Sequence, residues 1–553
     1  MLFRLLYLPL FFPHLLVTQA VSLSRRTSSA TVTLGHTKVI GTANLTTNID
    51  FFGGVPFASS PLGTLRFEAP VLQTSFPQNV TTFDATAFGD ACIQLSHLKV
   101  SEDCLKVDIF RPAGTSAQSN LPVMFWIHGG GLKTGGSPGI DPSALIARSV
   151  IRGTPIVYVA TNYRMGPFGF PVGNEVNVTG GVNLGVKDVL VALNWVQANI
   201  QVFGGDPTKV TIFGESAGAT LSSLTYMGNH IAGLARGAIF ASGSPSNQKA
   251  GSAPEGQPVW ERFVGNVTSC AAVATSGSTL GCMKNVSTAE LLEAYATVGE
   301  TGWTLIVDGD ILPALPSVLF AQGDFAKLPF MAGDVLDEGT LFVPQVPMQS
   351  YSSDMIKAAL TQLYSPPVPS VTDDELSDKI DELLMLYPDD PALGSPYNTG
   401  NETFGLPSGW KRSTSIFGDL HFQSTRRLWM QAAASQSSPI YSYLFTQPQT
   451  EDPSLGVNHK MTKEFFFGLV QDDGVSSDAA LSLIMMDYWL SFANSLDPND
   501  RKGTTRPAWG RYTAANNAIL QLNGQDNGTV MIKDDFRTEG INAINENPLI
   551  FYH

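Results

Sequence analysis

The stretch Val210-Thr-Ile-Phe-Gly-Glu-Ser-Ala-Gly218 decides the fold, because it joins an apolar strand to a helix start through a sharp turn. Its segment Gly214-Glu-Ser-Ala-Gly218 matches the pattern G-x-S-x-G. In such a turn the two glycines relieve crowding and leave the serine hydroxyl exposed. The position of the motif between a strand and an Ala-rich helix indicates that Ser216 is a nucleophile. A glycine-rich turn with an incidental serine is the alternative.

Apolar runs around this stretch predict a mostly parallel sheet. Residues 121–127 and 155–160 are almost continuously apolar, which is typical of parallel strands buried on both faces. Residues 186–200 carry apolar side chains at helical spacing, so strand, helix and strand alternate as in βαβ units. Further strands are expected at residues 237–241, 328–332 and 440–445.

The domain organisation follows from the absence of any repeat or linker. A length of 553 residues would suggest three or four domains at about 150 residues each. Helical patterns dominate the region from about 252 to 419, and insertions of this kind explain the length more simply. We therefore expect one α/β domain over residues 21–553.

Composition excludes several classes of protein. The charge is −15, from 33 Lys and Arg against 48 Asp and Glu, which disfavours binding to nucleic acid or anionic lipid. Charged residues make up 15% of the chain and hydrophobic residues 43%, so the chain can bury a large core and is not a disordered protein.

The first twenty residues predict a secretory signal peptide. Arg4 precedes a short apolar run, and the segment ends in Val17-Thr-Gln-Ala20, with small residues where a signal peptidase cleaves. A membrane anchor is the alternative, but Pro9 and Pro13 interrupt the run. We expect a secreted, extracellular protein without stable membrane anchoring.

Sequons and cysteines agree with an extracellular compartment. The four cysteines form two pairs that are close in sequence, and although three connectivities exist, local pairing is expected. A metal site is disfavoured because neither pair has C-x-x-C spacing. The candidate glycosylation sites are Asn44, Asn79, Asn177, Asn266, Asn285, Asn401 and Asn527.

A glycine-rich loop follows the apolar run 121–127. Its sequence, His128-Gly-Gly-Gly131, can turn backbone N–H groups toward a developing oxyanion, because glycine allows close approach and positive φ. We assign the oxyanion donors to the N–H groups of Gly130, Gly131 and Ala217. A phosphate-binding loop is the alternative, but no Lys-Ser/Thr follows in the required register.

A base and an acid should follow Ser216 in the chain. Among the later histidines, His230 is close to Ser216, His421 lies in a helical pattern, and His459 lies in a turn-rich loop beyond a late strand. A catalytic histidine belongs on such a loop, so His459 is favoured.

The identity of the catalytic acid stays open at this point. Asp334, Asp337 and Glu338 all follow the strand expected at residues 328–332.

The chain resembles the type-B carboxylesterase and lipase family of α/β-hydrolases, which includes cholinesterases and secreted fungal lipases. The resemblance covers nearly the whole mature chain. It rests on Phe51-Phe-Gly-Gly-Val-Pro-Phe57, Leu65-Arg-Phe67, Ser101-Glu-Asp-Cys-Leu105, the H-G-G-G loop, Asn162-Tyr-Arg164, Asn194-Trp-Val196, Phe203-Gly-Gly-Asp-Pro207 and the stretch 210–218.

The resemblance implies roles for particular residues. The family's acid falls on Glu338, and its histidine falls on His459. Its disulfides correspond to Cys92 with Cys104 and Cys270 with Cys282. A serine that supports the acid corresponds to Ser242. The family needs neither a metal nor an organic cofactor.

Two departures from the family bear on the substrate. Lipases of the family carry a lid in the first disulfide loop, whereas only residues 93–103 separate Cys92 from Cys104 here. Cholinesterases place a tryptophan in this loop for cation–π contact with choline, and residues 93–103 contain none. We expect neither a large lid nor choline specificity.

The sequence thus predicts a secreted serine carboxylic-ester hydrolase that acts through an acyl-enzyme on small-molecule or lipid esters. Because the chain is acidic, neutral esters are expected. The alternative enzyme is a true lipase or sterol esterase acting on long acyl chains. A non-catalytic, cholinesterase-like binding protein is the alternative from another class, disfavoured because Ser216, Glu338 and His459 are all present. No sequence feature predicts an oligomeric state.

Overall fold

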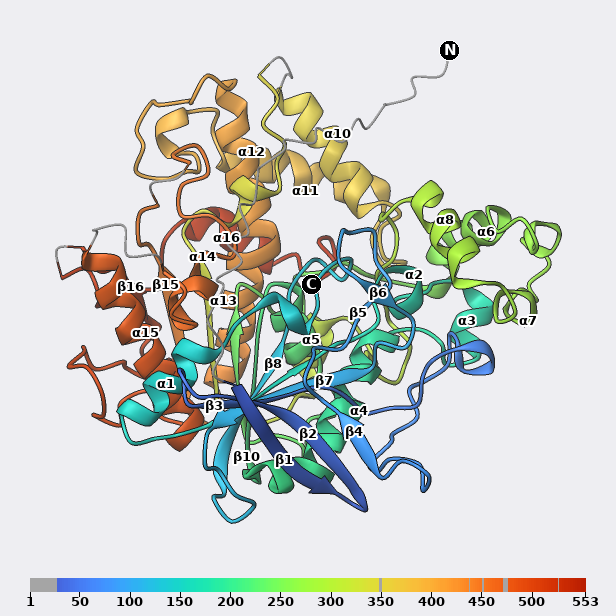
Figure 1. Cartoon of the computed structure of the whole chain (residues 1–553). Coiled ribbons are helices and arrows are strands. Elements are labelled where there is room, and N and C mark those ends of the chain that lie inside the picture. The colour runs from blue at the N-terminus through green and yellow to red at the C-terminus, as the bar shows by residue number, and fades with distance from the viewer. Residues whose placement is uncertain (1–26, 348–350, 437, 450–451, 471–475, 526) are drawn as a thin grey trace.

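The structure, a computed structural model, describes residues 27–553 except 348–350, 437, 450–451, 471–475 and 526 (Figure 1). The signal peptide expected at residues 1–20 lies outside the described residues. The assignment of residues 21–553 to one domain stays a prediction.

A thirteen-stranded sheet forms the centre of the described part of the chain. Its strand order is β1-β2-β3-β7-β9-β8-β10-β11-β14-β15-β16-β17, and β4 pairs with β2. The strands from β9 to β16 in this order run parallel, while β1, β2, β3 and β7 add an antiparallel side and β17 an antiparallel edge. The sheet strands are β1 (Thr27–Leu34), β2 (Thr37–Asn44), β3 (Ile49–Pro56), β4 (Thr82–Asp84), β7 (Lys106–Pro112), β8 (Leu121–Ile127), β9 (Val157–Thr161), β10 (Gly205–Glu215), β11 (Gly237–Ala241), β14 (Phe330–Val335), β15 (Ile440–Phe445), β16 (Ala518–Leu522) and β17 (Val530–Lys533).

The parallel strands are apolar at successive positions because helices cover both faces of the sheet. Along β8, Phe125 and Ile127 belong to one hydrophobic core, and Met124 and Trp126 belong to another. Successive side chains of a strand point to opposite faces, so the two cores lie on the two sides of the sheet.

The helices divide between these cores and the top of the molecule in Figure 1. Helices α4, α5, α6 and α13 contribute to the first core, and α1, α14 and α15 to the second. A third cluster joins α10, α11, α12 and α16 above the sheet. The longer helices are α1 (Ser143–Ile151), α4 (Leu184–Asn199), α5 (Ala217–Leu224), α6 (Ala253–Gly265), α8 (Thr288–Val298), α9 (Pro316–Gln322), α10 (Ser353–Tyr364), α11 (Asp373–Leu386), α12 (Ser408–Gly418), α13 (Ser424–Ala434), α14 (Met461–Phe466), α15 (Ser476–Ser495) and α16 (Thr538–Asn545). The short helices are α2 (Gly166–Gly169), α3 (Asn174–Val178) and α7 (Leu280–Met283).

The local cysteine pairing is confirmed. Cys92 is bonded to Cys104, and Cys270 to Cys282. The first disulfide belongs to a short loop that carries the two-stranded ribbon of β5 (Ala91–Cys92) and β6 (Val100–Ser101).

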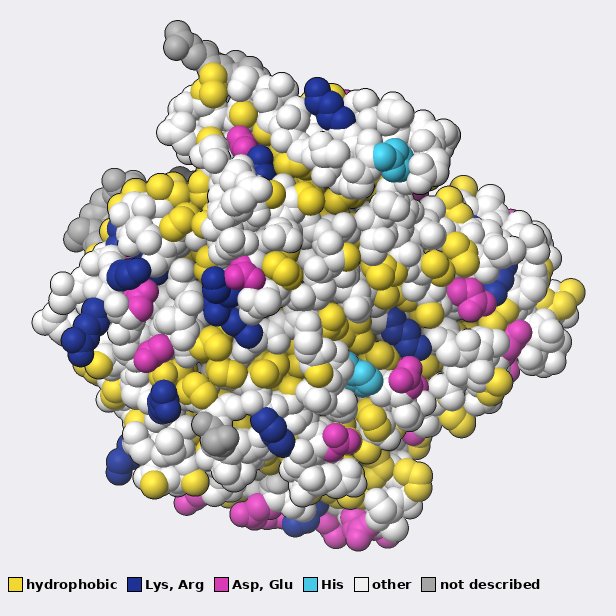
Figure 2. All heavy atoms as spheres, turned by 90° about the horizontal axis from the view of Figure 1, so that it is seen from below, with side chains coloured by type: hydrophobic (Ala, Val, Ile, Leu, Met, Phe, Trp, Pro, Cys, Tyr) yellow, Lys and Arg dark blue, Asp and Glu magenta, His cyan; other side chains and the backbone are white. Residues whose placement is uncertain are grey.

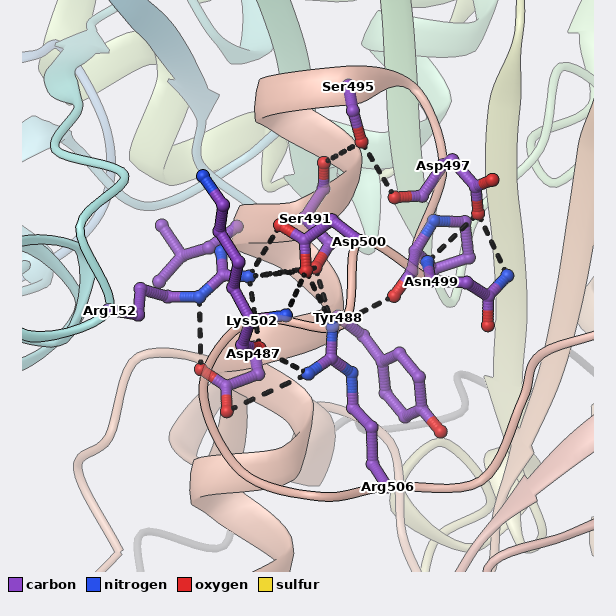
Figure 3. A network of polar contacts seen from close by, with 12 residues as sticks. Arg152, Asp487, Tyr488, Ser491, Ser495, Asp497, Asn499, Asp500, Lys502 and Arg506 are labelled. Carbon is purple, nitrogen blue, oxygen red and sulfur yellow. Dashed lines mark hydrogen bonds and ion pairs between the residues drawn. The ribbon is translucent and has the colours of Figure 1, made fainter.

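A buried network of charges ties α1 to α15 and to the loop that follows it (Figure 3). Asp487 on α15 accepts from Arg148 at 2.6 Å and lies 3.4 Å from Arg152. Asp500 accepts from Arg152 at 2.7 Å and from Arg506 at 3.1 Å. The contacts of Asp487 with Arg148 and of Asp500 with Arg152 join residues more than three hundred positions apart.

The surface seen in Figure 2 mixes charges of both signs. Basic and acidic side chains lie interspersed among apolar and neutral ones on this face, without an extended basic area. Among the described residues, no helix is both long and apolar enough to cross a bilayer.

Candidate active site

Ser216 occupies the sharp turn between β10 and α5. Its φ of 57° and ψ of −128° lie outside the regions that L-residues favour. A Cβ on Gly218 would come within 2.0 Å of the Ile127 carbonyl oxygen, and one on Gly214 within 2.4 Å of the Gly218 backbone. The two glycines therefore allow the close packing that holds Ser216 in this conformation.

The glycine loop after β8 packs directly against this turn. A Cβ on Gly129 would lie 2.7 Å from the Glu215 carbonyl oxygen and 3.2 Å from the Ser216 Cβ. Gly130 and Gly131 have φ values of 118° and 64°, which favour glycine. The loop closes through hydrogen bonds of 3.0 Å from the Lys133 and Thr134 N–H groups to the Gly130 carbonyl.

His459 and Glu338 meet across two loops at the same edge of the sheet. The imidazole Nδ1 lies 2.5 Å from Glu338 Oε2, and Glu338 Oε1 accepts from the Val335 N–H at 2.8 Å. Both side chains are buried. Because a carboxylate only accepts, Nδ1 carries the proton, and the Nε2 of a neutral His459 is free to act as a base.

The other two candidate acids serve different purposes. Asp334 accepts from Arg426 at 3.0 Å inside the protein. Asp337 accepts from the Ser395 hydroxyl and the Val457 N–H at 2.8 and 2.9 Å, and so ties the histidine loop to the acid loop. Of the three, only Glu338 hydrogen-bonds to His459 among the described residues.

Charges around His459 set its basicity. Burial lowers the pKa of His459, but the charge and hydrogen bond of Glu338, with a further contribution from Glu215, outweigh burial and raise this pKa above the ordinary 6.5. The Glu215 carboxylate lies 3.6 Å from His459 Nε2. Phe342 and Phe422 cover the imidazole, with ring centroids at 4.9 and 4.8 Å.

A cavity of about 890 Å³ opens above these groups and is lined by Ser216, His459, Gly130, Gly131 and Ala217, among others. We call it the Ser216 cavity. Part of its wall is apolar and exposed, namely Leu98, Leu341, Phe342 and Leu363.

The sequence did not single out the aromatic wall of this cavity. Phe422 comes from a π-helical turn (Asp419–Gln423) that also brings His421 to the cavity. Such turns are frequent at functional sites. His421 is held by a contact of 3.3 Å between its Nδ1 and the Asn247 carbonyl, and burial lowers its pKa to about 4. No sequence pattern signals a π-turn, so the place of these side chains in the cavity wall could not be predicted.

Several predicted residues remain without a structural test of their roles. The Ser242 hydroxyl is buried and has no hydrogen-bond partner among the described residues, so its support of the acid stays a prediction. None of the seven sequon asparagines is fully buried, and their glycosylation also stays a prediction.

The sheet, with its serine turn after a central parallel strand, defines the α/β-hydrolase fold. The sequence matches the carboxylesterase family over residues 28–542, and the chain belongs to this family of carboxylic-ester hydrolases.

Curated relatives and a solved structure match this chain over almost the same span as the family does. Secreted lipase 1 of Botryotinia fuckeliana is 34% identical over 96% of this chain and 95% of its own length. Lipase 2 of Geotrichum candidum is 33% identical over 89% and 91% of the two chains. The crystal structure of Aspergillus niger EstA superimposes with a TM-score of 0.80 at 27% identity, covering 95% of this chain and 99% of that one.

Proposed function

We propose that the protein is a secreted serine esterase in which Ser216, His459 and Glu338 form the catalytic triad. The observation that carries the proposal is the 2.5 Å contact between His459 Nδ1 and Glu338, made beside a cavity that both His459 and Ser216 line. An acid that holds the proton on Nδ1 leaves Nε2 to accept the serine proton.

The reaction proceeds through an acyl-enzyme. The Ser216 oxygen bonds to the ester carbonyl carbon while its proton passes to His459 Nε2. The tetrahedral oxyanion accepts hydrogen bonds from the N–H groups of Gly130, Gly131 and Ala217. The bond to the leaving alcohol then breaks, and His459 returns the proton to the alcohol oxygen. Water then attacks the acyl carbon while His459 takes its proton, the bond from this carbon to the Ser216 oxygen breaks and releases the acid, and His459 returns the proton to Ser216.

Secretion is part of the proposal. The signal pattern of residues 1–20, the two disulfides and the similarity to proteins named secreted lipases support it.

Ser216→Ala tests the catalytic assignment. We expect kcat on a 4-nitrophenyl ester to fall by about 10⁴-fold or more, because the triad acts as a unit. Circular dichroism should show an unchanged fold. A fluorophosphonate probe should label the wild-type protein at Ser216, as mapped by mass spectrometry, and should not label the variant. Turnover retained in Ser216→Ala would refute the nucleophile.

A lipase acting on long acyl chains is the second candidate. The exposed apolar side chains Leu98, Leu341, Phe342 and Leu363 favour it, because they offer a surface for an acyl chain at the Ser216 cavity. Rates on 4-nitrophenyl esters of increasing chain length, with and without an emulsion, separate the candidates. A rate that rises with chain length and at the interface supports a lipase, and a short-chain preference without interfacial gain supports a carboxylesterase.

A further inference from the structure

The wall of the Ser216 cavity has the opposite charge balance to the whole protein. Four lysines line it, namely Lys133, Lys249, Lys460 and Lys463, which we call the cavity lysines. The acids in the same wall are Glu215 and Glu300. Glu215 lies against His459, so its charge is directed at the imidazole. A chain with a net charge of −15 thus lines its proposed reaction site with more cations than anions.

Three separate loops bring these lysines together. In the sheet, β8 and β11 are the two neighbours of β10, the strand that leads to Ser216. Lys133 follows β8 and Lys249 follows β11, so their loops flank the serine turn on both sides. Lys460 directly follows His459 and precedes α14, and Lys463 lies on this helix. The fold therefore gathers them at the carboxyl edge of the sheet.

None of the cavity lysines makes an ion pair within the described part of the chain. Six other lysines do so, each within 4.0 Å of a carboxylate: Lys99, Lys106, Lys209, Lys284, Lys357 and Lys379. The protein's acids are numerous, yet of the described ones only Glu215 and Glu300 line the cavity. The cavity thus keeps positive charge that the protein does not neutralise.

Lys249 shows the clearest case of such an uncompensated charge. Among the described residues its ammonium contacts the carbonyl oxygens of Leu363 and Ser365, at 3.4 and 3.3 Å, and the face of the Tyr552 ring at 4.1 Å. Burial lowers the pKa of Lys249, and the charge of Glu255 opposes this only in part. A half-buried ammonium without a carboxylate partner is favourable chiefly when a ligand supplies one.

We propose that the natural ester carries a carboxylate, which the cavity lysines bind while the ester group lies at Ser216. The proposal rests on the proposed function, and it replaces the neutral ester expected from the overall charge. A cleft lined by one sign of charge focuses the field and raises the local concentration of oppositely charged substrate. The apolar wall would hold the carbon chain that joins the ester to the carboxylate.

Two substrates that differ in a single charge test the proposal. Mono-4-nitrophenyl suberate and 4-nitrophenyl octanoate have acyl chains of equal length, ending in a carboxylate and a methyl group. We expect the wild-type protein to have the higher kcat/KM on the suberate at low salt, and this preference to fall as salt screens the charges. In the double variant Lys249→Gln/Lys463→Gln, the ratio of kcat/KM for suberate to that for octanoate should fall about tenfold.

Lys357→Gln is the matched control. It removes one positive charge from a lysine on α10 that is paired with Asp381 and does not line the cavity, so the ratio should stay at the wild-type value. If the double variant does not fold, Lys463→Gln alone should lower the ratio about threefold.

An unchanged ratio in the folded lysine variants, or an equal fall in Lys357→Gln, would overturn the inference. In that case, octanoate hydrolysis that is lost in Ser216→Ala would still support the proposed function. Octanoate hydrolysis that persists in Ser216→Ala would refute the proposed function instead.

Discussion

At the scale of single residues, the environment of His459 explains how the proposed base is tuned. Glu338 lies on the Nδ1 side of the ring and Glu215 on the Nε2 side. Both carboxylates favour the protonated imidazole, and together they overcome the burial that would otherwise lower its pKa. Glu215 occupies the first of the two variable positions in the G-x-S-x-G pattern, so the motif itself does not account for a carboxylate there.

The raised pKa of His459 predicts the pH dependence. The base must be neutral, so kcat/KM should fall as the pH drops through the raised pKa of His459, above the ordinary 6.5. Glu215→Gln removes one carboxylate that raises this pKa, so the acid limb should move to lower pH. The measurement is kcat/KM against pH. Glu300→Gln, which removes a carboxylate from the cavity wall, is the control and should shift the limb less. An unchanged or upward-shifted limb in Glu215→Gln would contradict the assignment.

At the scale of elements, the turn between β10 and α5 depends on how closely α5 approaches β8. The first turn of the helix packs on the carbonyl groups at the end of β8, and the space at Gly218 is too small for a Cβ atom. Without glycine at this position, α5 and β8 would not pack this closely, because a side chain would separate them.

Gly218→Ala tests this packing. Its Cβ would lie 2.0 Å from the Ile127 carbonyl oxygen, so we expect a loss of about 1–3 kcal/mol of folding free energy and a strong loss of activity. Thermal and urea unfolding give the first quantity, and ester hydrolysis gives the second. Gly281→Ala, in the short helix α7, meets no atom within 4 Å and should be neutral or slightly stabilising. Equal stability of the two variants would refute the steric argument.

At the scale of the whole molecule, the charge network of Figure 3 joins α1 to α15 and the loop after it. Asp487 is fully buried and receives hydrogen bonds from Arg148 and the Thr504 N–H. Such a network stabilises the packing of distant segments because breaking it leaves buried charges without partners.

Asp487→Ala should therefore destabilise the protein strongly. We expect a loss of about 3–5 kcal/mol in the free energy of unfolding, measured with urea, because Arg148 and Arg152 lose a buried partner. Asp381→Ala removes an exposed acid paired with Lys357 and should cost at most about 1 kcal/mol. If the two losses are equal, the network does not stabilise the packing.

Much of the central sheet could be predicted from local sequence. The expected strands 121–127 and 440–445 coincide with β8 and β15, because nearly every residue in them is apolar. Short strand-like runs were expected from about residue 32, but β1 to β3 were not predicted individually, since a polar stretch such as Thr27–Leu34 has no continuous apolar run. These strands pair with one another, and β3 joins them to the rest of the sheet through β7, a pairing that local patterns do not encode.

The sequence by itself determined the fold class and the position of Ser216, because a strand, two glycines and a helix start are local features. It left the choice of the acid among Asp334, Asp337 and Glu338 open until the family resemblance pointed to Glu338. Only the tertiary structure showed which acid meets His459, since Arg426 and Ser395, which engage the other two, are distant in sequence. The charge of the cavity was likewise decided in three dimensions. Net charge is a sum over the chain, whereas an ester would experience the few charges that folding places around it.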